Sequence, residues 1–313
     1  MQEGKVASVN ISTEKGTVKK PAPQISIDAN GIRADAHAGN WHRQVSLLSM
    51  ESIERFSERV GREFHPGEFA ENITTRGIDL SHVGIFDRFE VAGVSLEVTQ
   101  IGKACHPDGC AIFQQVGKCV MPKEGIFCRT LFPGEVRAGD MIKHYPRPLS
   151  FLVITLSDRA SRGEYEDRSG PRVSAALEDW LGPSRWWFNI ENNIQSDDPV
   201  ELRDRIRAAE SDGIDVLITT GGTGLGPRDH TPDVMAELCD KLIPGIMEHI
   251  RIKYGTEKPN ALLSRAVAGV IGKMLVYSLP GSVRAVDEYM GEILKTMEHL
   301  ILTVNGIDPH ASL

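Results

Sequence analysis

After Ser150 the chain alternates between continuous apolar runs and amphipathic stretches. The runs FLVITLSD, DVLITTGG and MLVYSLPG each have the pattern of a buried strand that ends in a loop. The stretch PRVSAALEDWLG repeats its apolar residues at helical spacing and stops at Gly182. Alternation of this kind predicts a mostly parallel sheet with helices on both faces. We therefore expect a ligand site at the carboxyl ends of these strands.

The first 145 residues follow a different pattern, made of short alternating segments. In RFEVAGVSLEVTQIG every second residue is apolar on either side of Gly93, which predicts a hairpin. LFPGEVRAGDMI adds two further turn signals. The stretch SMESIERFSERVG predicts a helix, with Ser49 as its candidate cap. This half is predicted to be a mostly β, barrel-like unit.

The length of 313 residues suits two folded domains, each with its own core. The segment HYPRPLS, residues 144–150, contains two prolines and no apolar face, as a short stiff linker would. We expect one domain over residues 1–145 and a second over residues 149–313.

Composition narrows the function classes. A net charge of −8 argues against an extended nucleic-acid partner, which needs a basic face. The chain has neither an apolar stretch long enough for a membrane span nor the pattern of a secretory signal, so a cytoplasmic location is expected. The five cysteines are expected to be free or functional thiols rather than a disulfide framework.

The turn TTGGTGLGPRDHTPD, residues 219–233, follows an apolar run and contains four glycines. It does not fit a P-loop, which needs Lys and then Ser or Thr after the last glycine, or the dinucleotide fingerprint, whose third glycine would fall on Pro227. Gly221, Gly222 and Gly224 would allow positive φ angles and bring backbone amides close to a ligand. The alternative is a tight turn without a ligand.

The end of this turn, DHTPD, predicts a helix start with Thr231 as the cap and Pro232 as the first helical residue. Amides at a helix start favour an anion. A carboxylate at Asp229 would repel such an anion unless it also bound a cation. The residues therefore predict Mg²⁺ held by Asp229.

Further polar loops are expected at the same edge of the sheet. SDRASRGEYEDRSGP follows the first strand, and LPGS places Gly281 and Ser282 before the last helix, where they could meet a phosphate. NIQSDDPVELRD places Asp197 and Asp198 before another helix. These two acids are either helix caps or, if they lie near Asp229, metal ligands.

ITLSDRASRGEYEDRSGP, TTGGTGLGPRDHTPD and YSLPGS occur in an order that resembles the MogA/MoaB-type molybdopterin adenylyltransferase domain, over residues 151–306. The resemblance implies a three-layer α/β/α fold, often trimeric. It also implies a reaction in which ATP and Mg²⁺ adenylylate the terminal phosphate of molybdopterin before molybdate is inserted. The predicted substrate-binding residues are Ser157, Asp158, Arg159, Ser169, Gly221, Gly222, Thr223, Gly224, Thr231, Gly281 and Ser282.

The resemblance further implies that Asp229 is an essential acid and that a second acid follows an Ile-Pro pair. Gln195 and Ser196 occupy that place here, so Asp197 is the predicted second catalytic and metal-binding acid, with Asp198 as the alternative.

The chemistry is compatible with these residues. A substrate phosphate oxygen attacks the α-phosphorus, so the protein supplies positioning and charge neutralisation instead of a nucleophile. Mg²⁺ on Asp229 and Asp197 would screen the approaching phosphates, and Arg159 or Arg228 would steady developing charge. Both arginines are alternatively solvated surface charges.

In the first half, DAHAGNWHRQVSLL, PGEFAENITTRGIDL and LEVTQIGKACH resemble the MOSC domain. That family implies sulfur or metal–sulfur transfer, binding of molybdenum cofactor and one reactive thiol, which matches Cys105. Lys103 and His106 are near it in sequence, and positive charge would lower the pKa of the thiol.

The other thiols depart from the simple family pattern. The spacings of Cys110, Cys119 and Cys128 do not fit the close pairs of common zinc sites, although a metal–sulfur site that includes His106 remains an alternative. The pair His37 and His42, near Asp35, would line the same pocket or serve as structural hydrogen-bonding groups.

The sequence thus predicts a molybdenum cofactor biosynthesis protein that joins a MOSC module to a molybdopterin adenylyltransferase. A homotrimer and a molybdate-insertion protein are its expected partners. One alternative is a cofactor carrier that binds molybdopterin without turnover. The other is a sulfur carrier acting through its thiol on an oligomeric platform.

Overall fold

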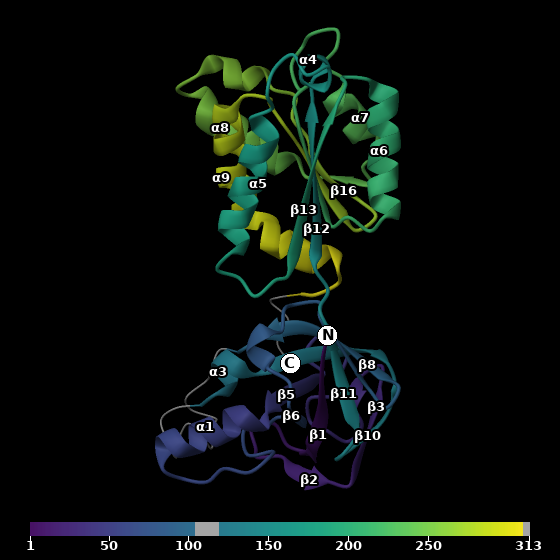
Figure 1. Ribbon diagram of the computed structural model, residues 1–313, viewed down its shortest axis with the longest axis vertical. Helices are drawn as coiled ribbons and strands as arrows, with labels where there is room; N and C mark the ends of the chain where they lie inside the picture. The colour runs from purple at the N-terminus through teal and green to yellow at the C-terminus, as the bar shows by residue number, and fades with distance from the viewer. Residues whose placement is uncertain (104–118, 309–313) are drawn as a thin grey trace. The chain divides into compact units, whose positions relative to one another are not determined.

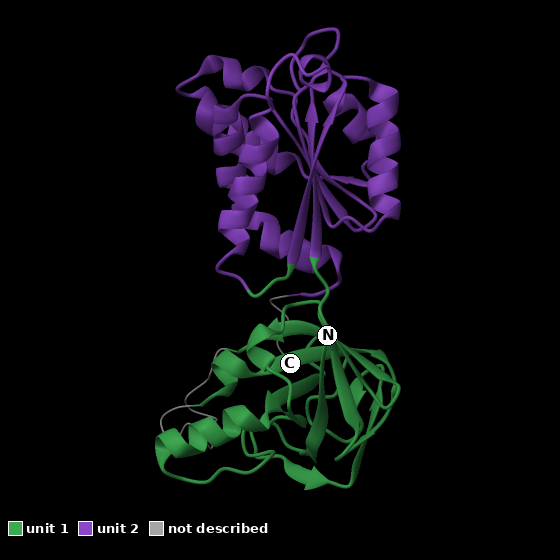
Figure 2. Cartoon of the chain, in the orientation of Figure 1, with its two compact units in different colours: residues 1–148, 185–187, 310–313 green, residues 149–184, 188–309 purple. Residues whose placement is uncertain are grey.

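The computed structural model describes residues 1–103 and 119–308 (Figure 1). The chain forms two compact units, Met1–Pro148 with Arg185–Trp187, and Leu149–Ser184 with Phe188–Pro309 (Figure 2). The two-domain prediction is therefore confirmed. No helix in the described ranges is both long and apolar enough to cross a membrane.

The first unit is mainly β. Its described elements are β1 (Gln2–Ile11), β2 (Lys20–Ala22), β3 (Gln24–Asp28), β4 (Gly31–Ile32), β5 (Val45–Ser49), α1 (Met50–Val60), β6 (Ile73–Arg76), η1 (Leu80–His82), β7 (Arg88–Val91), β8 (Val94–Ile101), α3 (Met121–Glu124), β9 (Ile126–Phe132), β10 (Gly134–Arg137) and β11 (Met141–Tyr145). The main sheet has the order β11-β7-β8-β9-β5-β6-β1-β2, and β11 also pairs with β1. The sheet therefore closes on itself, which confirms the barrel-like prediction.

The predicted hairpin is present. Phe89 and Val91 on β7 and the alternating apolar residues of β8 are buried in the barrel core. Ala92 and Gly93 between the strands have φ angles of +48° and +86°, as expected for a two-residue turn that follows the twist of the strands.

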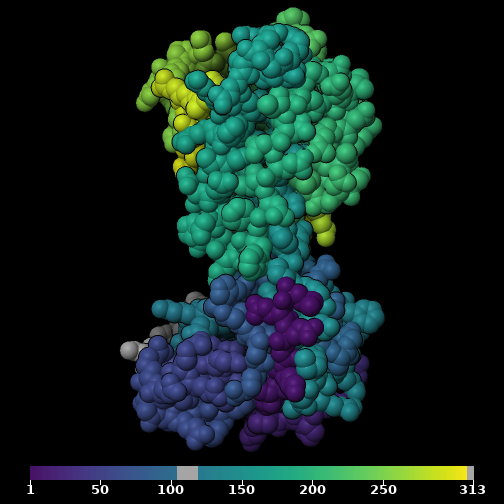
Figure 3. Space-filling model, viewed as in Figure 1, coloured from purple at the N-terminus to yellow at the C-terminus, as the bar shows by residue number. Residues whose placement is uncertain are grey.

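Helix α1 also agrees with its sequence signals. The Ser49 hydroxyl accepts a hydrogen bond from the Ser52 amide at 3.1 Å, and Gly61 ends the helix at a φ of +71°. Ile53 and Phe56 pack into an apolar cluster that includes Phe64 and Phe69. Residues of the α1 region form part of the blue surface of the first unit in Figure 3.

The segment predicted as a linker is shorter than expected. His144 and Tyr145 complete β11, and Leu149 already begins β12, so residues 146–148 alone connect the two strands. The His144 ring is buried in the barrel, with Nε2 2.6 Å from Asp87 Oδ2. The sequence pattern did not distinguish His144 from a linker residue, because Asp87, the partner of its Nε2 atom, is distant along the chain.

The second unit contains β12 (Leu149–Leu156), α4 (Asp158–Ser161), α5 (Ser169–Leu181), β13 (Phe188–Gln195), α6 (Pro199–Ser211), β14 (Val216–Thr220), α7 (Thr231–Leu238), β15 (Lys241–Leu242), α8 (Pro244–Gly255), η3 (Pro259–Leu263), β16 (Ala268–Ile271), β17 (Met274–Leu279) and α9 (Val283–Val304). The sheet order is β13-β12-β14-β17-β16-β15. The first four strands in that order are parallel, and β16 and β15 are antiparallel. The prediction of a mostly parallel sheet is confirmed.

The helices of this unit pack on the sheet through apolar stripes. Leu202 and Ile206 of α6 and Met235 of α7 share a buried cluster with Leu152 and Ile154 of β12. Helices α5 and α9 contact each other and the strands β12, β13 and β17. Figure 1 shows α6 and α7 on one side of the sheet and α5, α8 and α9 on the other. The loops that form the candidate site follow the carboxyl ends of β12, β14 and β17.

Candidate functional site

The loops after β14 and β17 are in direct contact. The Gly221 amide donates to the Leu279 carbonyl at 2.9 Å, and the Thr220 hydroxyl donates to the Pro280 carbonyl at 3.2 Å. A Cβ added to Gly281 would lie 3.4 Å from the Gly221 Cα. The glycine turn and the start of α9 are therefore held side by side, as the sequence predicted for two parallel strands of one sheet.

Two of the predicted glycines have the backbone that glycine favours. Gly221 and Gly222 have φ angles of +109° and +62°. A Cβ on Gly221 would lie 2.3 Å from the Leu156 carbonyl oxygen, so a side chain is also excluded by space. Gly224 has no positive φ, contrary to the prediction. A Cβ there would lie 2.8 Å from Asp229 Oδ2, so a larger residue would displace the Asp229 carboxylate.

Three consecutive amides of this turn have no protein acceptor. Within the described residues, the backbone N–H groups of Gly222, Thr223 and Gly224 donate no hydrogen bond. Successive unpartnered amides form a concave site for an anion. They border a cavity of about 520 Å³ that is also lined by Asp229 and Ser282. The anion-binding interpretation of the turn therefore has both the donors and the space that it needs.

Thr231 has a different local role from the one predicted. Helix α7 begins at Thr231 itself, with His230 in the cap position and no side-chain cap. The Thr231 hydroxyl instead donates to the Gly221 carbonyl at 3.1 Å. Its position one residue inside the helix lets it hold the back of the glycine turn.

The two predicted acids lie against this turn. Asp229 Oδ2 accepts a hydrogen bond from the Gly226 amide at 2.7 Å, and Asp197 Oδ2 accepts one from the Asp158 amide at 3.0 Å. A Cβ on Gly222 would be 3.7 Å from Asp197 Oδ1, and a Cβ on Gly224 would be 3.8 Å from Asp229 Oδ1. No donor from the described part of the chain reaches either Oδ1 atom.

Asp158 and Asp197 connect the loops after β12 and β13. The Asp197 amide donates back to Asp158 Oδ1 at 3.1 Å, and Arg228 Nη2 is 2.5 Å from Asp158 Oδ2. The hydrogen bond from the Asp197 amide, followed by the one from Arg228, holds the pKa of Asp158 below its usual value. Arg228 is therefore paired with an acid of the site instead of being a solitary surface charge.

The neighbouring Asp198 is engaged elsewhere. Its Oδ1 accepts hydrogen bonds from the Val200 and Glu201 amides at 2.8 and 3.1 Å, which makes it the cap of α6. The cap interpretation thus applies to Asp198, whereas Asp197 lies beside the glycine turn.

Other predicted residues have structural partners in the loop after β12. Ser157 caps α4 by accepting from the Ala160 amide at 3.2 Å, and its hydroxyl is 3.0 Å from that of Tyr165. The Ser169 hydroxyl donates to Asp167 Oδ1 at 2.9 Å, at the first residue of α5, which begins two residues earlier than expected. The Arg159 side chain is 69% exposed and lies 3.5 Å from Glu164.

Sequence reasoning did not identify Arg265. This residue follows η3, and its guanidinium donates to the Gly224 carbonyl at 2.9 Å and to the Asp229 carbonyl. Its role depends on contacts across more than thirty residues, and the sequence around it, LLSRAVAG, contains no local signal of that role.

In the first unit, Cys105, His106 and Cys110 lie outside the described residues. Cys128 is buried in β9, and burial raises the pKa of its thiol. No group of three metal-binding side chains occurs in the described part of the chain. The alternative of a metal–sulfur site is therefore neither supported nor tested by the described thiols.

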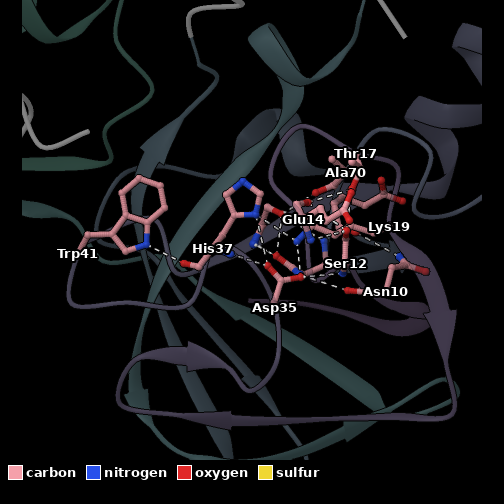
Figure 4. A network of polar contacts seen from close by, with 12 residues as sticks. Asn10, Ser12, Glu14, Thr17, Lys19, Asp35, His37, Trp41 and Ala70 are labelled. Atoms are coloured by element: carbon pink, nitrogen blue, oxygen red, sulfur yellow. Dashed lines mark hydrogen bonds and ion pairs between the residues drawn. The ribbon is translucent and has the colours of Figure 1, made fainter. Parts of the chain in front are cut away.

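Asp35 and His37 do come together, around a lysine that the sequence did not indicate (Figure 4). The buried Lys19 ammonium contacts Asp35 Oδ2, and His37 Nδ1 is 3.3 Å from Asp35 Oδ1 and 3.4 Å from Lys19 Nζ. The side-chain Nδ2 of Asn72 donates to Asp35 Oδ2 at 3.0 Å. Burial opposes ionisation of Asp35, but hydrogen bonds from His37 and Lys19 hold its pKa well below the usual value. His42 is buried nearby in sequence, with its ring 6.3 Å from that of Trp41.

The fold and the site define an α/β domain with a candidate anion site at the carboxyl ends of parallel strands. Comparison with known families gives the same division of the chain. A family described as a probable molybdopterin binding domain matches residues 152–299, and the MOSC domain matches residues 34–143.

Similar proteins agree with the first of these matches. The molybdopterin adenylyltransferase of Pyrococcus furiosus is 37% identical over 164 residues, which cover 51% of this chain and 93% of that protein. The molybdenum cofactor biosynthesis bifunctional protein of Synechococcus elongatus is 35% identical over 156 residues, 50% of this chain and 47% of that protein. A solved structure titled as the tungsten cofactor synthesizing protein MoaB from Pyrococcus furiosus covers 51% of this chain and 98% of its own, at 35% identity and a TM-score of 0.44. The chain belongs to the molybdopterin-binding family of molybdenum cofactor biosynthesis proteins and carries a MOSC domain ahead of that unit.

Proposed function

We propose that the second unit transfers AMP from ATP to molybdopterin in the presence of Mg²⁺, as a molybdopterin adenylyltransferase. The observation that carries the proposal is the set of three unpartnered amides that borders a cavity together with Asp229, with the Asp197 carboxylate beside Gly222. Membership in the family supports molybdopterin as the ligand of this cavity. A reaction between nucleotide phosphates requires a divalent cation, and the neighbouring carboxylates would bind it.

The donor set suits Mg²⁺. This ion usually binds to one or two protein carboxylates and completes its shell with substrate phosphates and water. Asp229 and Asp197 each offer an Oδ1 atom without a protein donor among the described residues. When bound, Mg²⁺ would neutralise charge on the phosphates. The oxygen ligands are hard, as Mg²⁺ prefers, and no thiol or imidazole is required.

The residues of the chain mainly position the substrates. The amides of residues 222–224 would hold a phosphate, and Thr231 and Leu279 fix the turn that presents them. A phosphate oxygen of molybdopterin attacks the α-phosphorus of ATP and pyrophosphate leaves, so no protein side chain needs to act as nucleophile. Arg228 is paired with Asp158 in the loop after β12, from which it would stabilise developing charge.

The test is an adenylylation assay with the full chain, molybdopterin, Mg²⁺ and labelled ATP. Wild type should form adenylylated molybdopterin and pyrophosphate, and Asp229→Ala should lower product formation by about 100-fold or more, because it removes charge neutralisation in the transition state. Asp212→Ala, at the exposed end of α6, serves as the control and should retain wild-type turnover. Bound molybdopterin without any product in wild type would instead support the carrier function.

For the first unit we propose a role in sulfur or metal–sulfur transfer with Cys105 as the reactive thiol. The match to the MOSC domain supports this proposal. Peptide mass spectrometry after incubation with a persulfide donor, which transfers its outer sulfur to a thiolate and leaves as a thiol, should show one added sulfur on Cys105, and metal analysis would detect a molybdenum or metal–sulfur adduct. Added sulfur on Cys239 rather than Cys105 would contradict the assignment.

We also propose an oligomeric state and limits for the two domains. Resemblance to a family that is often trimeric supports a homotrimer formed by a three-layer α/β/α domain over residues 149–313, with the MOSC module over residues 1–145. It equally supports a cytoplasmic location and a molybdate-insertion protein as partner. Light scattering of the purified chain would test the trimer, and a monomer at assay concentration would contradict it.

A further inference from the structure

Arg265 contacts the carbonyl groups of the glycine turn and of the residues that follow it. Its Nε donates to the Gly224 carbonyl at 2.9 Å, and its Nη2 donates to the Asp229 carbonyl. Its own backbone amide donates to the Thr223 carbonyl at 3.0 Å. Its Nη1 is 2.8 Å from Asp233 Oδ1 in the first turn of α7. One residue therefore contacts both ends of the segment from Gly224 to Asp229 and the helix that follows it.

This arrangement has a physical reason. In a trans peptide the carbonyl points opposite to the amide, so the Thr223 carbonyl, which shares a peptide with the Gly224 amide, needs a donor of its own and finds it in the Arg265 backbone amide. The Arg265 guanidinium supplies donors to the carbonyls of Gly224 and Asp229, at the two ends of the segment that follows the unpartnered amides. The planar guanidinium has five N–H groups in a fixed fork, so one arginine can satisfy two carbonyls and a carboxylate at once. A lysine could not reproduce this geometry, because its ammonium is a single point charge on a flexible stem.

The segment before Arg265 links the same residue to the cavity. Ser264 lines the cavity beside Gly224 and Asp229, and its hydroxyl accepts a hydrogen bond from Tyr289 at 2.9 Å. A displacement of the Arg265 side chain would therefore move the glycine turn, which borders the cavity.

We propose that Arg265 is a positioning residue for adenylyl transfer. It holds the amides of residues 222–224 and the carboxylate of Asp229 in the geometry that binds the phosphates of the substrates. The inference rests on the proposed adenylylation and adds to it a residue that touches neither substrate nor metal. The alternative is that the Arg265 and Asp233 pair merely stabilises the start of α7.

The first test compares Arg265→Ala with a matched arginine. Arg251 donates from Nη1 to the Ser264 and Ala266 carbonyls at 3.3 and 3.2 Å, so it also binds two carbonyls on either side of residue 265 but does not touch the glycine turn. We expect kcat of Arg265→Ala to fall by about 100-fold, because misplacement by about 1 Å has that effect on positioned reactions. The kcat of Arg251→Ala should stay within about threefold of the wild-type value.

The second readout does not depend on turnover. Hydrogen exchange at the amides of residues 222–224 should become slower when molybdopterin is added to wild type and to Arg251→Ala, but not when it is added to Arg265→Ala. If Arg265→Ala does not fold, Arg265→Lys replaces it in the test. The folded lysine variant should have the same thermal midpoint as Arg251→Ala and still lose both turnover and the protection of the three amides.

Two outcomes would overturn the inference while leaving the proposed function intact. One is wild-type turnover and amide protection in a folded Arg265 variant. The other is an equal loss of turnover in the Arg265 and Arg251 variants that follows their folded fractions. Failure of the proposed function is a separate result, because wild type itself would then form no adenylylated product.

Discussion

Asp197 and Asp198 are adjacent acidic residues with different hydrogen-bond partners. The sequence places both before a helix, and each suits a cap or a metal ligand. In the structure the Asp198 side chain accepts from two amides of α6, whereas Asp197 exchanges hydrogen bonds with Asp158 and lies next to Gly222. The choice depends on the direction of each side chain, and a pattern of residue types contains no information about that direction.

This division predicts opposite effects of two alanine substitutions. Asp198→Ala should lower the free energy of unfolding by about 1 kcal/mol, the usual effect of losing a helix cap, and leave adenylylation intact. Asp197→Ala should leave turnover at least about 100-fold lower, because a ligand for charge neutralisation is lost. Urea unfolding and the adenylylation assay measure the two effects. Loss of turnover in Asp198→Ala at full stability would reverse the assignment.

Lys19 is a second residue whose role depends on distant partners. Its side chain is 1% exposed and contacts Asp35, which also accepts hydrogen bonds from the amides of Ser12 and His37. The sequence indicated Asp35 and His37 but not Lys19, because a lysine in a polar stretch of the chain normally lies in solvent.

Lys19→Met should destabilise the first unit strongly. The substitution retains most of the side-chain volume but leaves the Asp35 carboxylate buried without its cation, so the free energy of unfolding should fall by about 3–5 kcal/mol. Arg33→Met is the control, because its ion pair with Asp28 is exposed and contributes about 1 kcal/mol or less. Chemical denaturation followed by tryptophan fluorescence measures both. Equal effects of the two substitutions would show that the buried pair contributes no more than the exposed one.

At the level of elements, the continuous apolar runs predicted β12, β14 and β17 because these strands are buried on both faces. Strand β13 was not predicted, because it lies at the edge of the sheet and its sequence, FNIENNIQ, is largely exposed. The short β15 and β16 are antiparallel additions at the other edge. Apolar runs thus identify the centre of a parallel sheet, whereas polar edge strands need the structure.

Helices α8 and α9 are joined by a charge cluster that should respond to acid. Glu292 of α9 accepts hydrogen bonds from Lys253 at 2.6 Å and from Lys295 at 2.8 Å. These two hydrogen bonds lower the pKa of Glu292 to about 2, from a usual value of 4.5. A depressed carboxyl pKa stabilises the fold fully above the usual value, and that contribution is lost as the pH falls from 4.5 to about 2.

The expected outcome is a smaller acid dependence in Glu292→Gln. Urea unfolding at neutral pH should show the variant less stable than wild type, and the difference should shrink as the pH falls through the window from 4.5 to about 2. Glu298→Gln, an exposed residue of the same helix, is the control and should keep the wild-type profile. A difference between wild type and Glu292→Gln that stays constant with pH would contradict the role of the ionised carboxylate.

At the level of the whole molecule, the change from alternating to continuous apolar segments predicted two units of different fold, and both are present. The second unit could be assigned in more detail than the first. Its site is built from loops at the ends of parallel strands, which the sequence order brings together in a known way. The proposed reactive thiol of the first unit lies in residues 104–118, outside the described ranges, so its role rests on the match to the MOSC domain.

The joining of two modules leads to a last prediction, about which unit each substitution affects. Adenylyl transfer as proposed uses a phosphate oxygen of molybdopterin as the nucleophile, so it requires no thiol. Cys105→Ser should therefore retain turnover within about twofold of wild type, which is a change well under one factor of ten. In the converse experiment, Asp229→Ala should lose adenylylation and still take up sulfur on Cys105, as measured by mass spectrometry. Asp229 lies at the cavity of the second unit, whereas Cys105 belongs to the first. A loss of adenylylation in Cys105→Ser would therefore mean that the thiol takes part in the phosphate reaction, and it would contradict the separation of the two chemistries.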